Sequence, residues 1–133
     1  MAPPVQPPKG AMTAVPPPDA VSFFDGSPQG LAICEAVFAS ADGLGDVRVR
    51  VSKSQVALRR HRGFAYLWRT DKYVHSGVPA VLSLALPYEL DSPRFKEVAH
   101  PAPSVWMHHL ELHDPSMVDA EVRQWIREAF EAA

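Results

Sequence analysis

The sequence contains very little cysteine and no long apolar run, and both absences narrow the class of protein. Its 133 residues include one cysteine, Cys34, which excludes an internal disulfide and any zinc or iron–sulfur site built from several cysteines. No stretch approaches the ~18 consecutive apolar residues of a membrane span. The first ten residues, MAPPVQPPKG, lack the basic and apolar regions of a secretory signal peptide. We therefore expect a cytoplasmic protein with no membrane segment.

Proline, by contrast, is abundant and unevenly placed. Seven of the 14 prolines lie within the first 18 residues, and repeated prolines favour an extended polyproline II conformation. We expect residues 1–20 to form a disordered tail and residues 21–133 to form a single domain. A domain of that length is near the commonest size, and a hydrophobic fraction of 47% is enough for a packed core.

Positive and negative charges nearly balance overall, with 13 basic and 15 acidic residues, but the positive charge is concentrated in one segment. The formal net charge is −2, which argues against a general nucleic-acid-binding protein. Residues 48–72, however, contain eight basic residues and only one acidic residue, Asp71. Such a separation of charge creates a local positive field on an otherwise acidic molecule. This segment is the strongest functional signal in the sequence.

Hydrophobic periodicity predicts an α+β domain. Ser27-Pro28 offers an N-cap and a first-turn proline for a helix over 28–41, and Asp114-Pro115-Ser116 starts a last helix that reaches almost to residue 133. Between the helices, alternation predicts strands over 47–51, 56–59, 64–69, 79–86 and 105–112. Residues 87–104 are expected to be mostly irregular, with room for a short edge strand near 95–98. The predicted fold is an antiparallel sheet of about five strands flanked by an N-terminal and a C-terminal helix.

Several stretches of the chain resemble an uncharacterised bacterial family, the domain of unknown function numbered 5655. The stretches that carry the resemblance are Phe24-Asp25-Gly26, residues 49–60 with Phe64-Ala65, Asp91-Ser92-Pro93-Arg94, residues 106–112, and the last helix with Trp125. The resemblance covers roughly residues 22–132. It implies a compact α+β sandwich, more distantly similar to YjbR-like domains, some of which are thought to touch DNA. It implies no activity and no binding residue.

The basic segment predicts a polyanion-binding hairpin. Guanidinium groups clustered near a turn suit phosphate, because each offers a bidentate pair of donors, and Tyr66, Trp68 and Tyr73 could stack on bases if they are exposed. Two alternatives remain: a solvated face paired with carboxylates, with Phe64, Tyr66 and Trp68 in the core, or an acidic protein partner. The candidate polyanion-binding residues are Arg48, Arg50, Lys53, Arg59, Arg60 and Arg62.

A histidine-rich strand offers a second candidate site. His109, Glu111 and His113 are of metal-ligating types and share one face of the strand. Positions four apart in a strand are, however, separated by about 13 Å, so a metal would need a further ligand, such as His75 or His100. His108 points to the other face, where we expect a hydrogen-bonded residue of the core.

The remaining polar candidates are weaker. Cys34 lies on the apolar face of the first predicted helix and is expected in the core, and Ser52-Lys53-Ser54 is expected in a hairpin turn without catalytic partners. We expect no cofactor. The leading prediction is a non-enzymatic binding module for nucleic acid or an acidic protein. The alternatives are a small metal-binding protein or enzyme built on the histidine strand, and a homodimer in place of a monomer.

Overall fold

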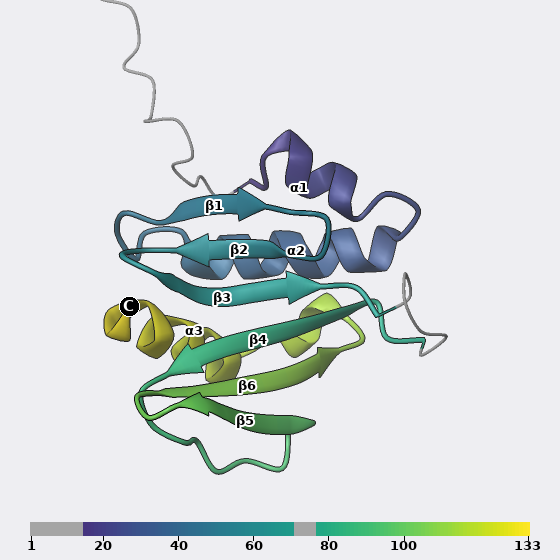
Figure 1. Cartoon of the computed structure of the whole chain (residues 1–133). Helices are drawn as coiled ribbons and strands as arrows, with labels where there is room; N and C mark the ends of the chain where they lie inside the picture. The colour runs from purple at the N-terminus through teal and green to yellow at the C-terminus, as the bar shows by residue number, and fades with distance from the viewer. Residues whose placement is uncertain (1–14, 71–76) are drawn as a thin grey trace, which may run out of the picture.

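A computed structural model describes residues 15–70 and 77–133, and its centre is a six-stranded antiparallel sheet (Figure 1). The strand order is β1-β2-β3-β4-β6-β5. The strands are β1 (Arg48–Val51), β2 (Val56–Arg59), β3 (Gly63–Trp68), β4 (Ala80–Leu86), β5 (Glu97–Ala102) and β6 (Val105–Leu112). The α+β prediction is confirmed, with one strand more than the expected five.

The additional strand is the edge strand β5. It begins at Glu97 and continues to Ala102, further than the short segment expected near 95–98. Its register against β6 shifts between Ala99 and Ala102. Pro101 lies within that shift, and a proline is tolerated there because an edge strand has one side free of ladder hydrogen bonds.

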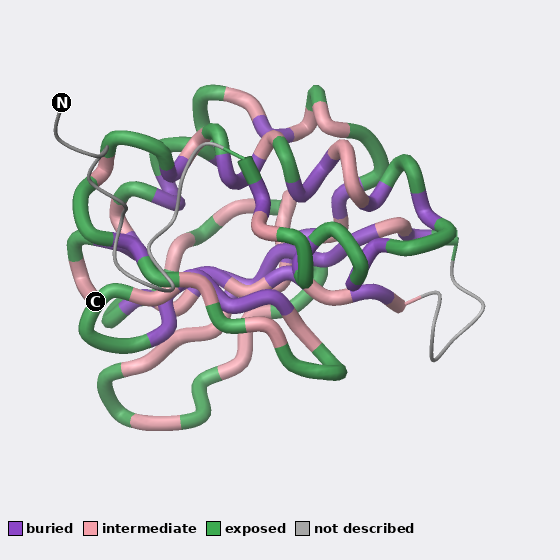
Figure 2. Tube along the Cα trace, turned by 90° about the horizontal axis from the view of Figure 1, so that it is seen from above, coloured by how far each residue is buried: buried purple, intermediate pink, exposed green. Residues whose placement is uncertain are grey.

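Two long helices cover one face of the sheet. α2 (Pro28–Ala41) and α3 (Ala120–Ala132) lie behind the strands in the view of Figure 1. The α2 boundaries agree with the predicted helix over 28–41, and the Ser27 side chain accepts a hydrogen bond from the Gly30 amide. Seen from above in Figure 2, the buried segments run through the strands and the inner sides of the helices. The hydrophobic core therefore lies between the helices and this single face of the sheet.

The start of the last helix differs in detail from its prediction. Asp114 caps a short 3-10 turn, η1 (Pro115–Met117), by accepting a hydrogen bond from the Ser116 amide at 2.8 Å. α3 itself begins at Ala120, where Asp119 accepts from the Val122 amide at 3.1 Å. Each aspartate therefore caps a separate turn.

A short first helix, α1 (Pro18–Phe23), lies partly within the segment expected to be a tail. Its first residue is a proline, which the first turn of a helix accommodates because the amide there has no intrahelical partner. Ala20 is fully buried, and Arg69 fixes the end of the helix by donating to the carbonyl oxygens of Phe23 and Asp25 at 3.0 and 2.8 Å. The ordered domain therefore begins before residue 21. Residues 1–14 of the predicted tail lie outside the described residues.

A β-bulge in β3 changes the face on which one aromatic residue lies. Leu58 pairs with Ala65 but Arg59 pairs with Gly63, so Phe64 is an extra residue between them. Phe64 is completely buried and meets Phe130 of α3 edge to face, with ring centroids 5.6 Å apart. The alternative that placed Phe64, Tyr66 and Trp68 together in the core is therefore wrong, because the alternation restarts after the bulge and leaves only Phe64 of the three buried.

Candidate functional site

The second face of the sheet carries no helix of the described residues and combines basic, aromatic and polar side chains. Strand register aligns Arg50, Ala57, Tyr66, Ser83 and His109 in one row across five strands. Residues opposite each other in antiparallel strands share a face, and the face alternates along each strand. We call this surface the open face; it comprises Arg48, Arg50, Ala57, Arg59, Tyr66, Trp68, Val81, Ser83, Ala85, Met107, His109 and Glu111.

Three of the predicted polyanion-binding arginines lie together on the open face. Arg48 on β1 is directly opposite Arg59 on β2, and Arg50 lies two residues further along β1. Arg48 has one long ion pair with Asp46, at 3.7 Å between exposed side chains. Within the described ranges, the side chains of Arg50 and Arg59 have neither an ion pair nor a hydrogen bond. These two guanidinium groups therefore keep all their donors available.

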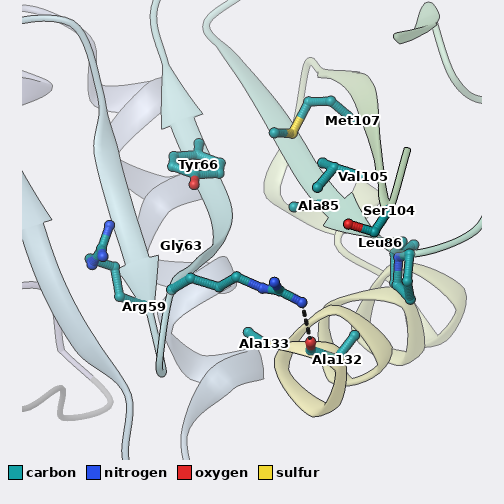
Figure 3. A pocket seen from close by; sticks show the side chains of 12 residues that line it. Arg59, Gly63, Tyr66, Ala85, Leu86, Ser104, Val105, Met107, Ala132 and Ala133 are labelled. Atoms are coloured by element: carbon teal, nitrogen blue, oxygen red, sulfur yellow. Dashed lines mark hydrogen bonds between the residues drawn. The ribbon is translucent and has the colours of Figure 1, made fainter. Parts of the chain in front are cut away.

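The other three predicted residues are placed differently. Arg62 donates to the Ala132 carbonyl oxygen at 3.0 Å, the bond drawn in Figure 3. Arg60 donates to the Phe130 carbonyl oxygen at 3.3 Å and covers the Phe130 ring, 4.5 Å from its centroid. Both residues thus bind carbonyl oxygens at the carboxyl end of α3, where their positive charge also interacts favourably with the helix dipole. Lys53 is exposed between β1 and β2.

A hollow of about 280 Å³ lies between Arg59 and Arg62 on one side and β6 on the other (Figure 3). Tyr66 lies along its floor toward Gly63, with its hydroxyl in the space that a Cβ atom of residue 63 would occupy. Met107 of β6 lines the far side. Gly63 therefore allows the Tyr66 phenol to lie low on the sheet, half-buried, beside Arg59.

Three polar side chains form a hydrogen-bonded chain beside Tyr66. The Trp68 indole Nε1–H donates to Ser83 Oγ at 3.0 Å, and Ser83 Oγ lies 2.7 Å from His109 Nδ1. Ser83 is 4% exposed, whereas Trp68 and His109 are half-buried. Sequence reasoning missed Ser83; the signal was a single polar residue within the apolar strand AVLSLAL.

The histidine strand does not assemble a metal centre from the described residues. No three His, Cys, Asp or Glu side chains in the described ranges are grouped closely enough to hold an ion. His109 is bonded to Ser83, His113 lies exposed beyond the end of β6, and His100 stacks on Trp106 with ring centroids 3.7 Å apart. His75 lies outside the described residues, as do Asp71, Lys72 and Tyr73.

His108 and Cys34 belong to the core, as the sequence predicted. His108 is fully buried, and its Nε2 accepts a hydrogen bond from the Leu90 amide at 2.9 Å. Its Nδ1 therefore carries the proton and faces the carbonyl oxygens of Trp106 and Leu84, at 3.1 and 3.3 Å. Burial lowers the pKa of His108 and raises the pKa of the Cys34 thiol to about 12. Neither side chain faces the open face.

Two further sequence predictions can be compared with the structure. None of the helices in the described ranges has the length and apolar character of a membrane span. The Ser52-Lys53-Ser54 segment forms the tight turn between β1 and β2, where the Ser52 amide donates to the Gln55 carbonyl oxygen. The hairpin position expected for these residues is thus confirmed.

Comparison with known proteins identifies a family but no characterised relative. Neither the curated proteins nor the solved structures give a match. The family model described as Domain of unknown function (DUF5655) matches residues 20–133, which include every element from α2 to α3. This match confirms the family resemblance drawn from the sequence. The chain belongs to the DUF5655 family of domains of unknown function.

Proposed function

We propose that this domain is a non-enzymatic binding module whose open face binds single-stranded nucleic acid. The observation that carries the proposal is the position of Arg50 and Arg59, two guanidinium groups without a partner among the described residues, next to the half-buried ring of Tyr66. Guanidinium groups bind phosphate through paired donors, and aromatic rings on a sheet surface stack on bases.

The distribution of charge over the open face favours a particular orientation of the strand. Arg48, Arg50 and Arg59 lie on β1 and β2, whereas Glu111 lies on β6 and Glu97 on the neighbouring edge strand. The three arginines attract phosphates to the β1–β2 side, whereas the two glutamates, partly offset by Lys96, disfavour phosphates on the β5–β6 side. The bases of a bound strand then face Tyr66 and the strands beyond it.

The aromatic residues favour a single strand over a duplex. Tyr66 and Trp68 are half-buried side chains of β3, in the middle of the sheet. A duplex presents phosphates and base edges but keeps the faces of its bases stacked, so a ring lying on a sheet cannot reach them.

The cytoplasmic location expected from the sequence is compatible with this ligand. The YjbR-like relationship and the oligomeric state remain predictions.

Binding is tested by the fluorescence anisotropy of a short labelled single strand titrated with the full chain. If about three arginines contact phosphates, affinity should fall about 20-fold between roughly 50 and 200 mM salt. The double variant Arg50→Glu/Arg59→Glu should abolish binding at low salt and keep the circular dichroism spectrum of the wild type.

The matched control is Arg127→Glu, which reverses an exposed arginine on α3, behind the sheet. Arg127→Glu and the single variant Arg59→Glu change the net charge by the same amount, which is half of the change in the double variant. These two single variants are therefore compared with each other. The proposal is wrong if Arg59→Glu and Arg127→Glu weaken binding equally, or if no single strand binds at low salt. In the second case an acidic protein becomes the better partner for the same arginines.

A further inference from the structure

The hydrogen-bonded chain of Trp68, Ser83 and His109 fixes which nitrogen of His109 carries a hydrogen. An indole Nε1–H can only donate, so Ser83 Oγ accepts from Trp68 at 3.0 Å. Ser83 is 4% exposed and its hydroxyl hydrogen needs an acceptor. His109 Nδ1, at 2.7 Å, is the acceptor that the described residues provide. Neutral His109 therefore carries its hydrogen on Nε2.

The Nε2–H group of His109 is then a donor without a partner among the described residues. No buried side-chain nitrogen or oxygen of the described ranges lacks a hydrogen bond, so this donor is directed to accessible space. The ring is held in place, because Nδ1 is bonded to Ser83 and the Trp68 ring lies edge-on to it, with centroids 6.5 Å apart. His109 thus presents one oriented donor at a fixed position on the open face.

The space beside His109 has the character of a small ligand site. It is a hollow of about 450 Å³ lined by Ser54, Gln55, Tyr66, Trp68, Ser83, Met107 and His109. Apolar and aromatic side chains with a few placed polar groups are typical of sites for small ligands, and the volume is within the usual range. The side-chain amide of Gln55, which has no hydrogen bond to the described residues, adds a donor and an acceptor at the rim.

We propose that this hollow is a nucleobase subsite, in which one unpaired base lies against Tyr66 and Met107 and accepts a hydrogen bond from His109 Nε2–H. The proposal rests on the proposed function, because it assigns the base of a strand whose phosphates meet Arg50 and Arg59. Tyr66 is shared between this hollow and the one lined by Arg50 and Arg59. A base in the hollow beside His109 and a phosphate in the hollow beside Arg50 and Arg59 would thus lie on adjoining parts of one surface. The chemical class recognised is a planar heterocycle with an acceptor on its edge.

The test compares a natural single strand with an abasic strand of the same length, which keeps the phosphates and lacks the bases. We expect the natural strand to bind the wild-type chain at least about tenfold more tightly, as stacking and a base-edge hydrogen bond require. His109→Asn places an amide oxygen where Nδ1 accepts from Ser83 but has no group at the Nε2 position. This variant should lose most of the preference for the natural strand.

Two further variants control for loss of structure. His109→Gln can place an amide N–H near the Nε2 position and should restore part of the preference. His113→Asn makes the same substitution at an exposed site beyond the end of β6 and should leave the preference unchanged. A long-range ¹H–¹⁵N spectrum of the free chain should show neutral His109 as the Nε2–H tautomer, and the Nδ1–H tautomer would overturn the inference.

The outcomes separate this proposal from the one on which it rests. If both strands bind equally and Arg50→Glu/Arg59→Glu removes both, phosphate binding stands and the subsite is wrong. If the natural strand is preferred but His109→Asn keeps that preference, the base lies elsewhere and the subsite is again wrong. If neither strand binds at low salt, both proposals fail together.

Discussion

Arg48 and Arg59 lie directly opposite each other on neighbouring strands of the open face. Cβ atoms of such a pair are about 5 Å apart, and like charges in this arrangement destabilise a sheet by up to about 1 kcal/mol. Asp46 offsets the repulsion only in part, through an ion pair of 3.7 Å between exposed groups. A bound phosphate between the two guanidinium groups would replace repulsion with attraction. The pair therefore favours binding at a small cost in the stability of the free domain.

Replacement of Arg59 should accordingly improve stability while it weakens binding. Arg59→Gln removes one charge of the Arg48 pair and keeps a long polar side chain. We expect the free energy of unfolding to rise by a few tenths of a kcal/mol and the affinity for a single strand to fall. Urea unfolding and anisotropy measure the two quantities; a loss of both stability and affinity would contradict this account of the pair.

Replacement of Arg60 or Arg62 should have the opposite effect: it should lower stability and leave binding largely unchanged. Their side chains bond to carbonyl oxygens at the end of α3, and Arg60 also covers the Phe130 ring. Arg60→Ala and Arg62→Ala should each lower the free energy of unfolding by about 1 kcal/mol. Strand binding should change far less than in Arg59→Gln. A large loss of affinity without loss of stability would place these arginines in the binding surface instead.

Gly63 should be required for the position of Tyr66. A Cβ atom at residue 63 would meet the Tyr66 hydroxyl and lie 2.6 Å from its Cζ atom. Gly63→Ala should therefore displace the ring, destabilise the domain by about 1–3 kcal/mol and weaken binding.

The double variant Gly63→Ala/Tyr66→Leu removes the ring that the new methyl group meets. It should be more stable than the sum of the two single changes predicts, while binding remains weak. Chemical denaturation of the four proteins measures this coupling, and strictly additive changes would contradict the close packing of the two residues.

His108 should make the domain less stable in mild acid. Burial holds the pKa of its imidazole below the ordinary value of 6.5 in the folded protein. The unfolded chain therefore takes up a proton as the pH falls through about 6.5, and the folded chain does not. Stability from this residue is fully present above that pH and decreases below it, until the lowered folded-state pKa is reached.

His108→Gln tests this pH dependence. The amide can retain a hydrogen bond to the Leu90 region but does not titrate. The unfolding free energy of the His108→Gln variant should be lower than that of the wild type near neutral pH. The difference between the two proteins should narrow as the pH falls. Parallel curves for the two proteins between about pH 7 and 5 would show that His108 is not the titrating group.

Local sequence patterns predicted much of the fold. The Ser27 cap and the proline after it located the start of α2, and alternation located most of the strands. α1 was missed because three consecutive prolines favour an extended chain, and the burial of Ala20 against the core depends on tertiary packing. The position of Phe64 could not be predicted from alternation, because the bulge depends on the register between two strands and periodicity within one strand does not reveal that register.

The candidate site was predictable only in part. The basic character of the hairpin could be read from the sequence, and alternation placed Arg48 and Arg50 on one face. The separate role of Arg60 and Arg62 depends on where α3 ends, 70 residues later in the chain. The bond between Ser83 and His109 joins two strands through their register, so neither strand alone indicated it.

An NMR titration of the full chain with a short single strand, at low and then moderate salt, shows whether the open face binds nucleic acid. We expect shifts at the Arg50 and Arg59 side chains, at Tyr66 and at the Trp68 indole, and these shifts should diminish as salt rises. The outer surfaces of α2 and α3 should not respond. Shifts confined to the helices, or none at low salt, would contradict the assignment of the open face as a nucleic-acid-binding surface.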